Sequence, residues 1–403
     1  MSLASWAGSS LTGSLTVSTE TGESLRHATW LELFFDLVFI VALAELGASL
    51  HDSLGVAGFV RFAALFAVVW WVWLAVSYYA DTYATDDLLS RLFVVVAMFL
   101  VILLSRTIPD ALAGGSLAFA ASVFALRVLL TLGHLRALYM RSEARQFVQY
   151  WVGLEVLVTA VWGLSLLVPP PGRYGLWVAS VSLGTAGLAV VYLGFDTIET
   201  QVSHFSERLG LFTILVLGET VLGVSYGTSF VALGAWAVFV GALAFAIVVA
   251  VWWLYFDRFD EQAVSWSPPD EDDRWLEARQ RVIVNIYSHY LVHGGIVAMG
   301  VGLAVAVEAS LAAHALPAGT PLVLYTGLAA LLVGVALSHR TSPSSLGARP
   351  VLARCVLAAV FLALAAGWQP RSPVVVVGAA VCLLCALVAV ETGRRAVTAP
   401  VPG

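Results

Sequence analysis

The stretch that decides the fold is Trp30-Leu31-Glu32-Leu33-Phe34-Phe35-Asp36-Leu37-Val38-Phe39-Ile40-Val41-Ala42-Leu43-Ala44-Glu45. It is apolar enough to enter a lipid bilayer, yet it carries three carboxylates. An ionised carboxylate at the centre of a membrane helix costs roughly 2.5–3.5 kcal/mol even on lenient insertion scales. A chain that keeps three in one span must shield them from lipid, pair them with cations or use them in its function.

The composition is that of a membrane protein with many spans. Of the 403 residues, 60% are hydrophobic and 11% are charged, and the mean hydropathy is +0.91. Apolar runs recur along the whole length, which leaves no room for a large soluble domain. The net charge of −6 lies in loops, without the clustered basic face that nucleic acid needs. We therefore expect the lipid bilayer as a partner, and no nucleic acid.

Helix length sets the number of expected spans, because about 20 apolar residues cross the hydrocarbon core. Twelve stretches qualify: 30–48, 61–79, 88–105, 115–135, 149–168, 175–195, 209–226, 232–256, 282–307, 321–338, 351–368 and 373–391. The third is the weakest, since its strictly apolar part is short. The sequence thus predicts an all-α polytopic membrane bundle of about twelve transmembrane helices.

All 20 cationic residues are arginine, and their distribution tests this count. With both termini on one side, that side receives Arg26, Arg91, Arg136, Arg141, Arg145, Arg208, Arg258, Arg274, Arg279, Arg281, Arg340, Arg349, Arg354, Arg394 and Arg395. The other side receives Arg61, Arg106, Arg173 and Arg371, and Arg127 stays inside a span. Positive charge marks the cytoplasmic side. We expect a bacterial plasma membrane protein with both termini in the cytoplasm.

The domain organisation follows from the same count. Residues 1–25 are rich in Ser, Thr and Gly and lack the features of a signal peptide, so we expect a disordered cytoplasmic tail. A single transmembrane domain is expected over 26–395, followed by a short tail over 396–403.

A weak internal repeat suggests two parallel six-helix halves, 26–200 and 201–395. Ile40-Val41-Ala42-Leu43-Ala44-Glu45 resembles Ile214-Leu215-Val216-Leu217-Gly218-Glu219, and Trp70-Trp71-Val72-Trp73 resembles Trp252-Trp253-Leu254-Tyr255. Such halves would be related by an axis along the membrane normal. Chance alignment of apolar segments is the alternative.

The three acids of the first span do not form one cluster. Glu32 and Asp36 share a helix face, whereas Glu45 lies about 180° around the helix and about 13 Å deeper. Arg26, His27 or the helix dipole could hold Glu32 and Asp36 at the membrane interface. A functional role for Glu32 and Asp36 is the alternative, and the sequence favours neither interpretation over the other.

Glu219 is the strongest candidate for a charged residue with a functional role. It lies about ten residues into its span, near the bilayer midplane, and Gly218 and Gly223 would let neighbouring helices approach. Arg127 is similarly deep in the fourth span. The alternative is that Arg127 neutralises Glu219 or Glu45 and clamps the bundle.

A polar stripe runs along the ninth span, where Asn285, His289 and His293 follow one another at a spacing of four residues. This spacing places both imidazoles on one face, where they could relay protons, bind a metal or pack through hydrogen bonds. The glutamate of HExxH is absent, and we expect no metal and no cofactor.

Other polar residues carry weaker signals. Glu155 lies about a turn inside its span and could reach the cytoplasmic surface, and solvated helix ends explain Glu207 and Arg208. Anionic lipid headgroups could bind three juxtamembrane arginines, Arg136, Arg141 and Arg145. The three cysteines, Cys355, Cys382 and Cys385, are expected to be buried small hydrophobes.

Two long motifs resemble a known family. Residues Trp30 to Phe39 are similar to the opening signature of the bacterial low temperature requirement protein A family. A second signature is similar to His204-Phe205-Ser206-Glu207-Arg208-Leu209-Gly210-Leu211-Phe212-Thr213-Ile214-Leu215-Val216-Leu217-Gly218-Glu219. The resemblance implies a multipass bacterial membrane protein. It draws attention to Trp30, Glu32, Phe34, Asp36, His204, Glu207, Arg208, Gly218 and Glu219, and it implies no activity.

Three functional hypotheses follow. The leading one is a secondary transporter or ion-conducting protein, with proton coupling as one form, in which Glu219 is the central charge. The second is a membrane scaffold or envelope-stress factor whose buried charges only specify packing. The third is a membrane-embedded enzyme that uses Glu and His, and this is the least favoured.

Overall fold

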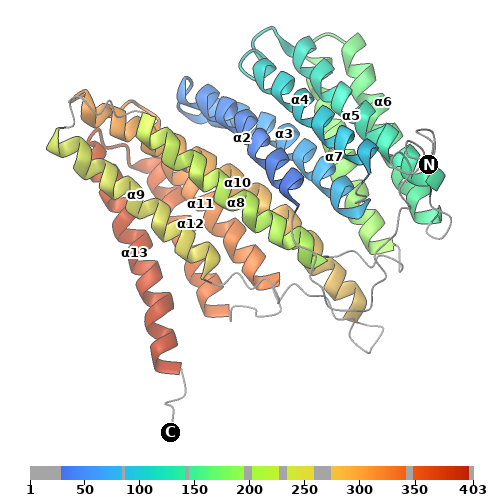
Figure 1. Cartoon of the computed structure of the whole chain (residues 1–403). Helices are drawn as coiled ribbons and strands as arrows, with labels where there is room; N and C mark the ends of the chain where they lie inside the picture. The colour runs from blue at the N-terminus through green and yellow to red at the C-terminus, as the bar shows by residue number, and fades with distance from the viewer. Residues whose placement is uncertain are drawn as a thin grey trace, which may run out of the picture. The chain divides into compact units, whose positions relative to one another are not determined.

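The computed structural model describes residues 29–83, 87–140, 145–194, 202–226, 234–257, 274–341 and 348–398 (Figure 1). Over these ranges every regular element is an α-helix and there is no strand. The helices are α2 (Trp30–His51), α3 (Val56–Thr82), α4 (Leu88–Thr107), α5 (Ser116–Met140), α6 (Arg145–Leu167), α7 (Gly172–Gly194), α8 (Val202–Tyr226), α9 (Ala235–Phe256), α10 (Arg274–Leu311), α11 (Thr320–Thr341), α12 (Ala348–Gly367) and α13 (Pro373–Thr398). The expected tail over 1–25 and residues 399–403 of the expected C-terminal tail lie outside the described residues.

Of the twelve helices in the described chain, eleven are long and apolar enough to cross a membrane. The span that we expected to be weakest forms α4, and it qualifies. The twelfth helix is α7, in which Val191 and Tyr192 lie outside the residues whose side chains are described. The predicted all-α polytopic fold is confirmed: this is a multipass membrane protein.

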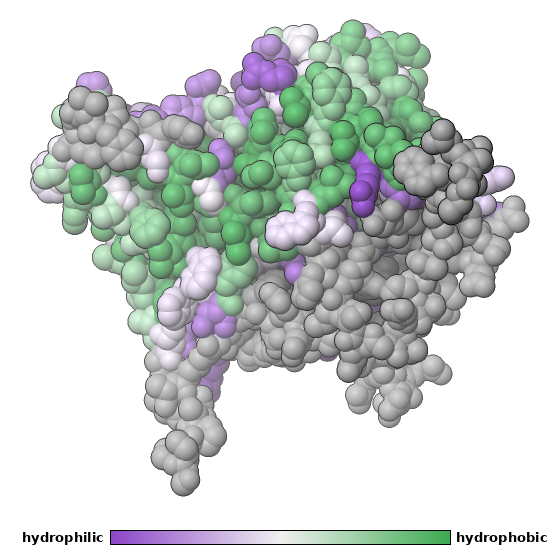
Figure 2. All heavy atoms as spheres, viewed as in Figure 1, coloured by the Kyte–Doolittle hydropathy of each residue, from purple (hydrophilic) through white to green (hydrophobic). Residues whose placement is uncertain are grey.

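The exposed faces of the helices are apolar, as a lipid environment requires. On α4 the exposed side chains include Leu92, Val95, Phe99 and Ile102, which recur at helical spacing. Figure 2 shows hydrophobic residues over much of the described surface that faces the viewer. These faces indicate contact with lipid along the spans.

Two compact units make up the chain, and their bounds fall inside α2, α3, α8 and α10. Unit 1 comprises Met1–Leu46, Ala64–Arg208 and Ser265–Ile283. Within it α4 packs on α5, α5 on α6 and α6 on α7. The expected single domain with halves 26–200 and 201–395 stays a prediction.

Unit 2 comprises Gly47–Ala63, Leu209–Val264 and Val284–Gly403. Within it α11 packs on α12, and α13 contacts both α9 and α12. Glycines bring α10 and α11 into backbone contact: a Cβ at Gly295 would lie 2.7 Å from the carbonyl oxygen of Gly327. Small residues at such a crossing let membrane helices approach closely.

Asp87 caps the N-terminus of α4. Its Oδ1 accepts a hydrogen bond from the backbone N–H of Ser90 at 2.7 Å, and its Oδ2 accepts one from Arg136 of α5. Burial acts to raise the pKa of Asp87, but the hydrogen bonds from Ser90 and Arg136 outweigh it and hold the pKa below its usual range. The ionised form is therefore the one that stabilises this end of α4.

Replacing Asp87 with alanine is expected to lower the stability of the folded protein by about 1 kcal/mol at pH 7, the usual effect of losing an N-cap. Because the folded pKa is depressed, the contribution of Asp87 is fully present above the unfolded pKa of about 3.9 and is lost as pH falls through the folded pKa. Thermal melting in detergent should show that wild type melts at a higher temperature than the Asp87→Ala variant at pH 7, and that this difference decreases as the pH falls below about 3.9. A difference in melting temperature between wild type and Asp87→Ala that increases on acidification would contradict this account.

Candidate functional site

A buried ion pair in unit 1 joins the first long motif to the second. Arg208 of α8 donates from Nε to Oδ2 of Asp36 on α2 at 3.2 Å, and from Nη2 to Oδ1 at 3.0 Å. The Arg208 and Asp36 side chains are 1% and 0% exposed. Two hydrogen bonds between a guanidinium and one carboxylate are the geometry in which arginine binds an acid most strongly.

Three further contacts complete the surroundings of this pair. Trp73 Nε1 donates to Oδ1 of Asp36 at 2.8 Å, and Arg208 Nη1 donates to the carbonyl oxygen of Ser77 at 3.3 Å. The guanidinium carbon lies 5.8 Å from the centroid of the Phe35 ring. The expectation that Arg208 is a solvated helix end is wrong, because the acid that holds it lies in a distant part of the sequence.

Glu32 is buried at the start of α2, where it closes a capping box. Its Oε2 accepts from the backbone N–H of Thr29 at 2.8 Å and from the Thr29 hydroxyl at 3.0 Å. The backbone N–H of Glu32 donates to that hydroxyl at 3.3 Å. This reciprocal pattern stabilises a helix N-terminus, so Glu32 has a structural role that the Thr-x-x-Glu spacing itself could have revealed.

The other two predicted charges of unit 1 have separate partners. Glu45 accepts from Arg106 of α4 at 2.6 Å in a partly exposed pair. Arg127 of α5 donates from Nη1 to Glu155 of α6 at 3.3 Å, and both side chains are buried. The expectation that Glu155 reaches the surface is wrong, and Arg127 does not neutralise Glu45.

In unit 2 the predicted stripe on α10 reaches across to α9. His289 Nδ1 lies 2.7 Å from the carbonyl oxygen of Asn285, and its Nε2 lies 2.8 Å from the hydroxyl of Tyr255. A carbonyl only accepts, so Nδ1 carries the proton and Tyr255 donates to Nε2. The Asn285 amide oxygen accepts from Ser338 of α11 at 2.7 Å.

His293 continues this polar line toward α8. Its ring centroid lies 5.5 Å from that of His289, and its Nε2 lies 3.0 Å from the Thr213 hydroxyl. The Thr213 hydroxyl donates to the Leu209 carbonyl at 2.8 Å, so its oxygen accepts from His293. Both predicted histidines are buried and take part in one network.

At the far end of the line, Arg354 of α12 is enclosed by hydrogen-bond acceptors. It donates to both carboxylate oxygens of Glu391 on α13, at 2.9 and 2.8 Å, and to His339 Nδ1 at 2.8 Å. It also donates to the Leu254 carbonyl at 3.2 Å. The His339 ring lies 6.2 Å from that of Tyr255, between centroids.

We call the buried side chains that follow one another along this line the unit 2 chain. They are Thr213, His293, His289, Tyr255, His339, Arg354 and Glu391. The two α10 histidines were predicted from their spacing. Arg354 was counted only among the arginines on the side of the termini, and Glu391, at the end of an expected span, was not singled out.

Glu219, the leading candidate from the sequence, stands apart from the unit 2 chain. It lies on α8 with intermediate exposure, and no described residue forms a hydrogen bond or ion pair with it. Its neighbour Thr220 instead faces α10, where a Cβ at Gly300 would lie 2.8 Å from the Thr220 hydroxyl oxygen. The role predicted for Glu219 stays a prediction.

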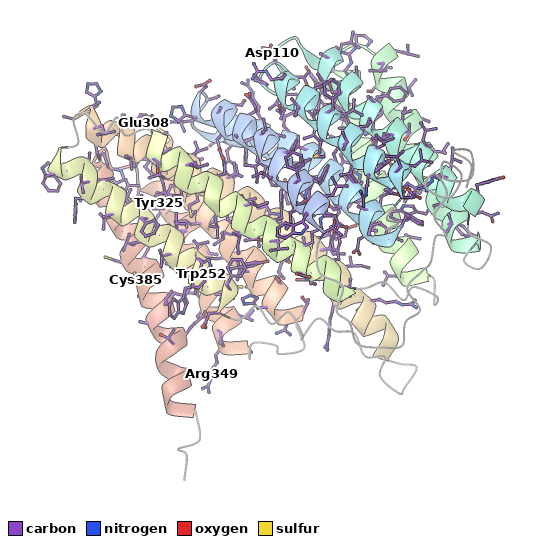
Figure 3. The ribbon with its side chains drawn as sticks, in the orientation of Figure 1. Asp110, Trp252, Glu308, Tyr325, Arg349 and Cys385 are labelled. Carbon is purple, nitrogen blue, oxygen red and sulfur yellow. The ribbon has the colours of Figure 1, made fainter. Side chains whose placement is uncertain are left out.

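Several weaker expectations also have outcomes. Arg136 pairs with Asp87, whereas Arg141 lies outside the described residues, as do the side chains of Arg145 and His204. The expectation of buried cysteines is wrong, since all three are exposed on α12 and α13; Figure 3 labels Cys385. Across the described residues no cluster of three His, Cys, Asp or Glu side chains could hold a metal.

Comparisons with known proteins agree with the two motifs. The family model described as "Bacterial low temperature requirement A protein (LtrA)" matches residues 27–390. An uncharacterized protein of Rhizobium meliloti (strain 1021) is 31% identical over 294 residues, which cover 68% of this chain and 68% of that protein. No solved structure matches the chain.

Proposed function

We propose a function for this chain, which belongs to the bacterial low temperature requirement A family. The chain is a proton-coupled secondary transporter or a proton-conducting protein. The observation that carries the proposal is the unit 2 chain, in which titratable side chains from five helices follow one another inside membrane spans. Ionisable groups at membrane depth are costly and typically mark ion or proton pathways.

At the centre of the unit 2 chain, one nitrogen of His289 is able to take up a proton. The Tyr255 hydroxyl donates to the bare Nε2 of His289, and the Nδ1 proton of His289 points to a carbonyl. In the proposed pathway His289 binds a proton at Nε2 and later releases it from the same nitrogen, because the Asn285 carbonyl accepts a hydrogen bond from Nδ1 but cannot take up a proton.

Vesicle experiments test the proposal directly. Purified protein is reconstituted into vesicles that contain a pH dye, and a potassium diffusion potential drives protons inward. Wild-type vesicles should acidify several-fold faster than protein-free vesicles. Equal rates at several potentials, with correctly inserted protein, would refute conduction.

A Glu219→Gln variant in the same vesicles separates two pathways. If the unit 2 chain conducts by itself, this variant should retain the wild-type rate. Loss of flux would instead restore Glu219 as the central charge, as the sequence analysis proposed. Whichever result the Glu219→Gln variant gives, proton conduction itself is tested by comparing the acidification rate of wild-type vesicles with that of protein-free vesicles.

A membrane scaffold is the second candidate function. The saturated pairs Asp36–Arg208 and Arg354–Glu391 favour it, because fully hydrogen-bonded buried pairs specify packing without any transport. A scaffold predicts that neutral double variants of each pair support growth at the wild-type level. A transporter predicts that the Arg354 and Glu391 double variant loses flux although it folds.

We further propose that the chain lies in the bacterial plasma membrane with both termini in the cytoplasm. The distribution of arginine between alternate loops supports this orientation. Arg136, Arg141 and Arg145 are proposed to lie near anionic headgroups on that side. A reporter enzyme that works only in the cytoplasm, fused after Gly403, should be active; inactivity would reverse the orientation.

A further inference from the structure

Three arginines are fully buried, and one of them differs from the others. Arg208 and Arg354 each bind a carboxylate through two hydrogen bonds and donate to a carbonyl as well. Arg127 makes a single hydrogen bond, 3.3 Å long, to Glu155. Its Nε is buried and has no hydrogen-bond partner among the described residues. Buried polar groups are rarely left this way, so a missing partner is indicated.

Arg127 belongs to a column of buried side chains between α3, α5 and α6, all in unit 1. The column consists of Trp71, Tyr78, Arg127, His134, Trp151 and Glu155. Seven residues separate its members on α3 and on α5, and four separate them on α6, so each helix presents one face.

The contacts of the aromatic rings divide the column into two groups of side chains, which we call its first and second levels. At the first level the guanidinium carbon of Arg127 lies 5.7 Å from the centroid of the Trp71 ring. At the second level the Trp151 ring lies 5.0 Å from Tyr78 and 6.0 Å from His134, between centroids. Two residues seven apart on a helix are separated by about 10 Å. The two levels of the column are therefore separate along the helix axes.

Four buried nitrogens of the column lack partners within the described structure: Trp71 Nε1, Arg127 Nε, His134 Nε2 and Trp151 Nε1. Arginine and tryptophan nitrogens donate and never accept. Three of the four atoms therefore need an acceptor. Gly184 of α7 packs directly against the Trp71 ring, since a Cβ there would lie 2.8 Å from Trp71 Nε1, closer than real Cβ contacts allow.

We propose that this column binds a small monovalent anion, held by Arg127 and Trp71. An acceptor-only ligand matches the two unpartnered donors, Arg127 Nε and Trp71 Nε1, and the hydrogen bond between Arg127 and Glu155 is long and single. Glu155 is the resident carboxylate with which the anion competes. Halides and short carboxylates share this chemistry. The site lies apart from the unit 2 chain and does not depend on the proposed function.

Equilibrium binding to the full-length protein in detergent tests this site without any flux measurement. Calorimetric titrations use sodium chloride or sodium acetate against sodium gluconate at constant ionic strength. We expect saturable binding of at least one of the two anions. Comparing the chloride titration with the acetate titration shows whether the site binds a halide or a carboxylate. The affinity should fall at least tenfold in Arg127→Gln and several-fold in Trp71→Phe.

A third variant keeps the test valid if those two fold poorly. Glu155→Gln removes the competing charge and should bind the anion more tightly, an effect that misfolding cannot imitate. Trp162→Phe is the matched control, because the Trp162 indole nitrogen is also buried without a described partner but its ring stacks on Trp177. Absence of saturable binding to wild type, or wild-type affinity in Glu155→Gln and Trp71→Phe, would overturn the proposal and leave a bridging water as the partner.

Discussion

Replacing Asp36 with asparagine is expected to destabilise the protein by about 3–5 kcal/mol, the usual effect of removing one partner of a buried ion pair. The physical reason is that Arg208 cannot lose its proton and has no route to solvent, since its side chain is 1% exposed. Asparagine keeps the shape of Asp36 and can still accept from Trp73, so the lost interaction is the charge. The expected readout is a large fall in the melting temperature in detergent.

Two comparisons make this prediction specific. The double variant Asp36→Leu with Arg208→Met removes both charges and should recover most of the loss, because apolar residues can replace a buried pair. Glu45→Gln breaks a partly exposed pair with Arg106 and should cost less than about 1 kcal/mol. If Asp36→Asn melts like Glu45→Gln, the buried pair does not hold the two motifs together.

Replacing Tyr255 with phenylalanine is expected to lower proton flux close to the rate of protein-free vesicles. The change removes one oxygen and leaves the ring that packs against Phe256 and His289. Without the hydroxyl, His289 Nε2 loses the donor that lies 2.8 Å away. The unit 2 chain is then broken between α9 and α10, and flux should fall at every imposed potential.

Tyr325→Phe is the matched control for this change. Tyr325 on α11, labelled in Figure 3, is as buried as Tyr255. Its hydroxyl donates to the backbone carbonyl of Val376 at 3.0 Å. Each buried hydrogen bond that is lost should cost about 1 kcal/mol, and Tyr255→Phe loses its contact with Thr213 as well as the one with His289. Flux should fall only in Tyr255→Phe. Equal fluxes in the two variants would remove Tyr255 from any pathway.

The fold was predictable because its cause is local. Apolar length and the breaks between spans predict each helix, and even the short apolar run of α4 forms a full span. The expected span over 175–195 likewise forms a helix, α7. Whether these helices divide into two halves depends on contacts that hydropathy does not encode.

The site was predictable only in part, because pairing is a tertiary property. Helical spacing of four correctly placed His289 and His293 on one buried face. Depth in the span correctly marked Arg127 as buried, but depth alone could not choose Glu155 over Glu219 or Glu45. Arg354 and Glu391 were missed because each lies near a helix end, where charges are usually solvated.

The measurement that tests the central claim most directly is proton uptake by vesicles that contain the His289→Gln variant. Glutamine can still exchange hydrogen bonds with Asn285 and Tyr255, but it cannot bind and release a proton at neutral pH. We predict that uptake falls to the rate of protein-free vesicles while the melting temperature stays within a few degrees of wild type. Wild-type uptake in the correctly folded variant would contradict the role of the unit 2 chain.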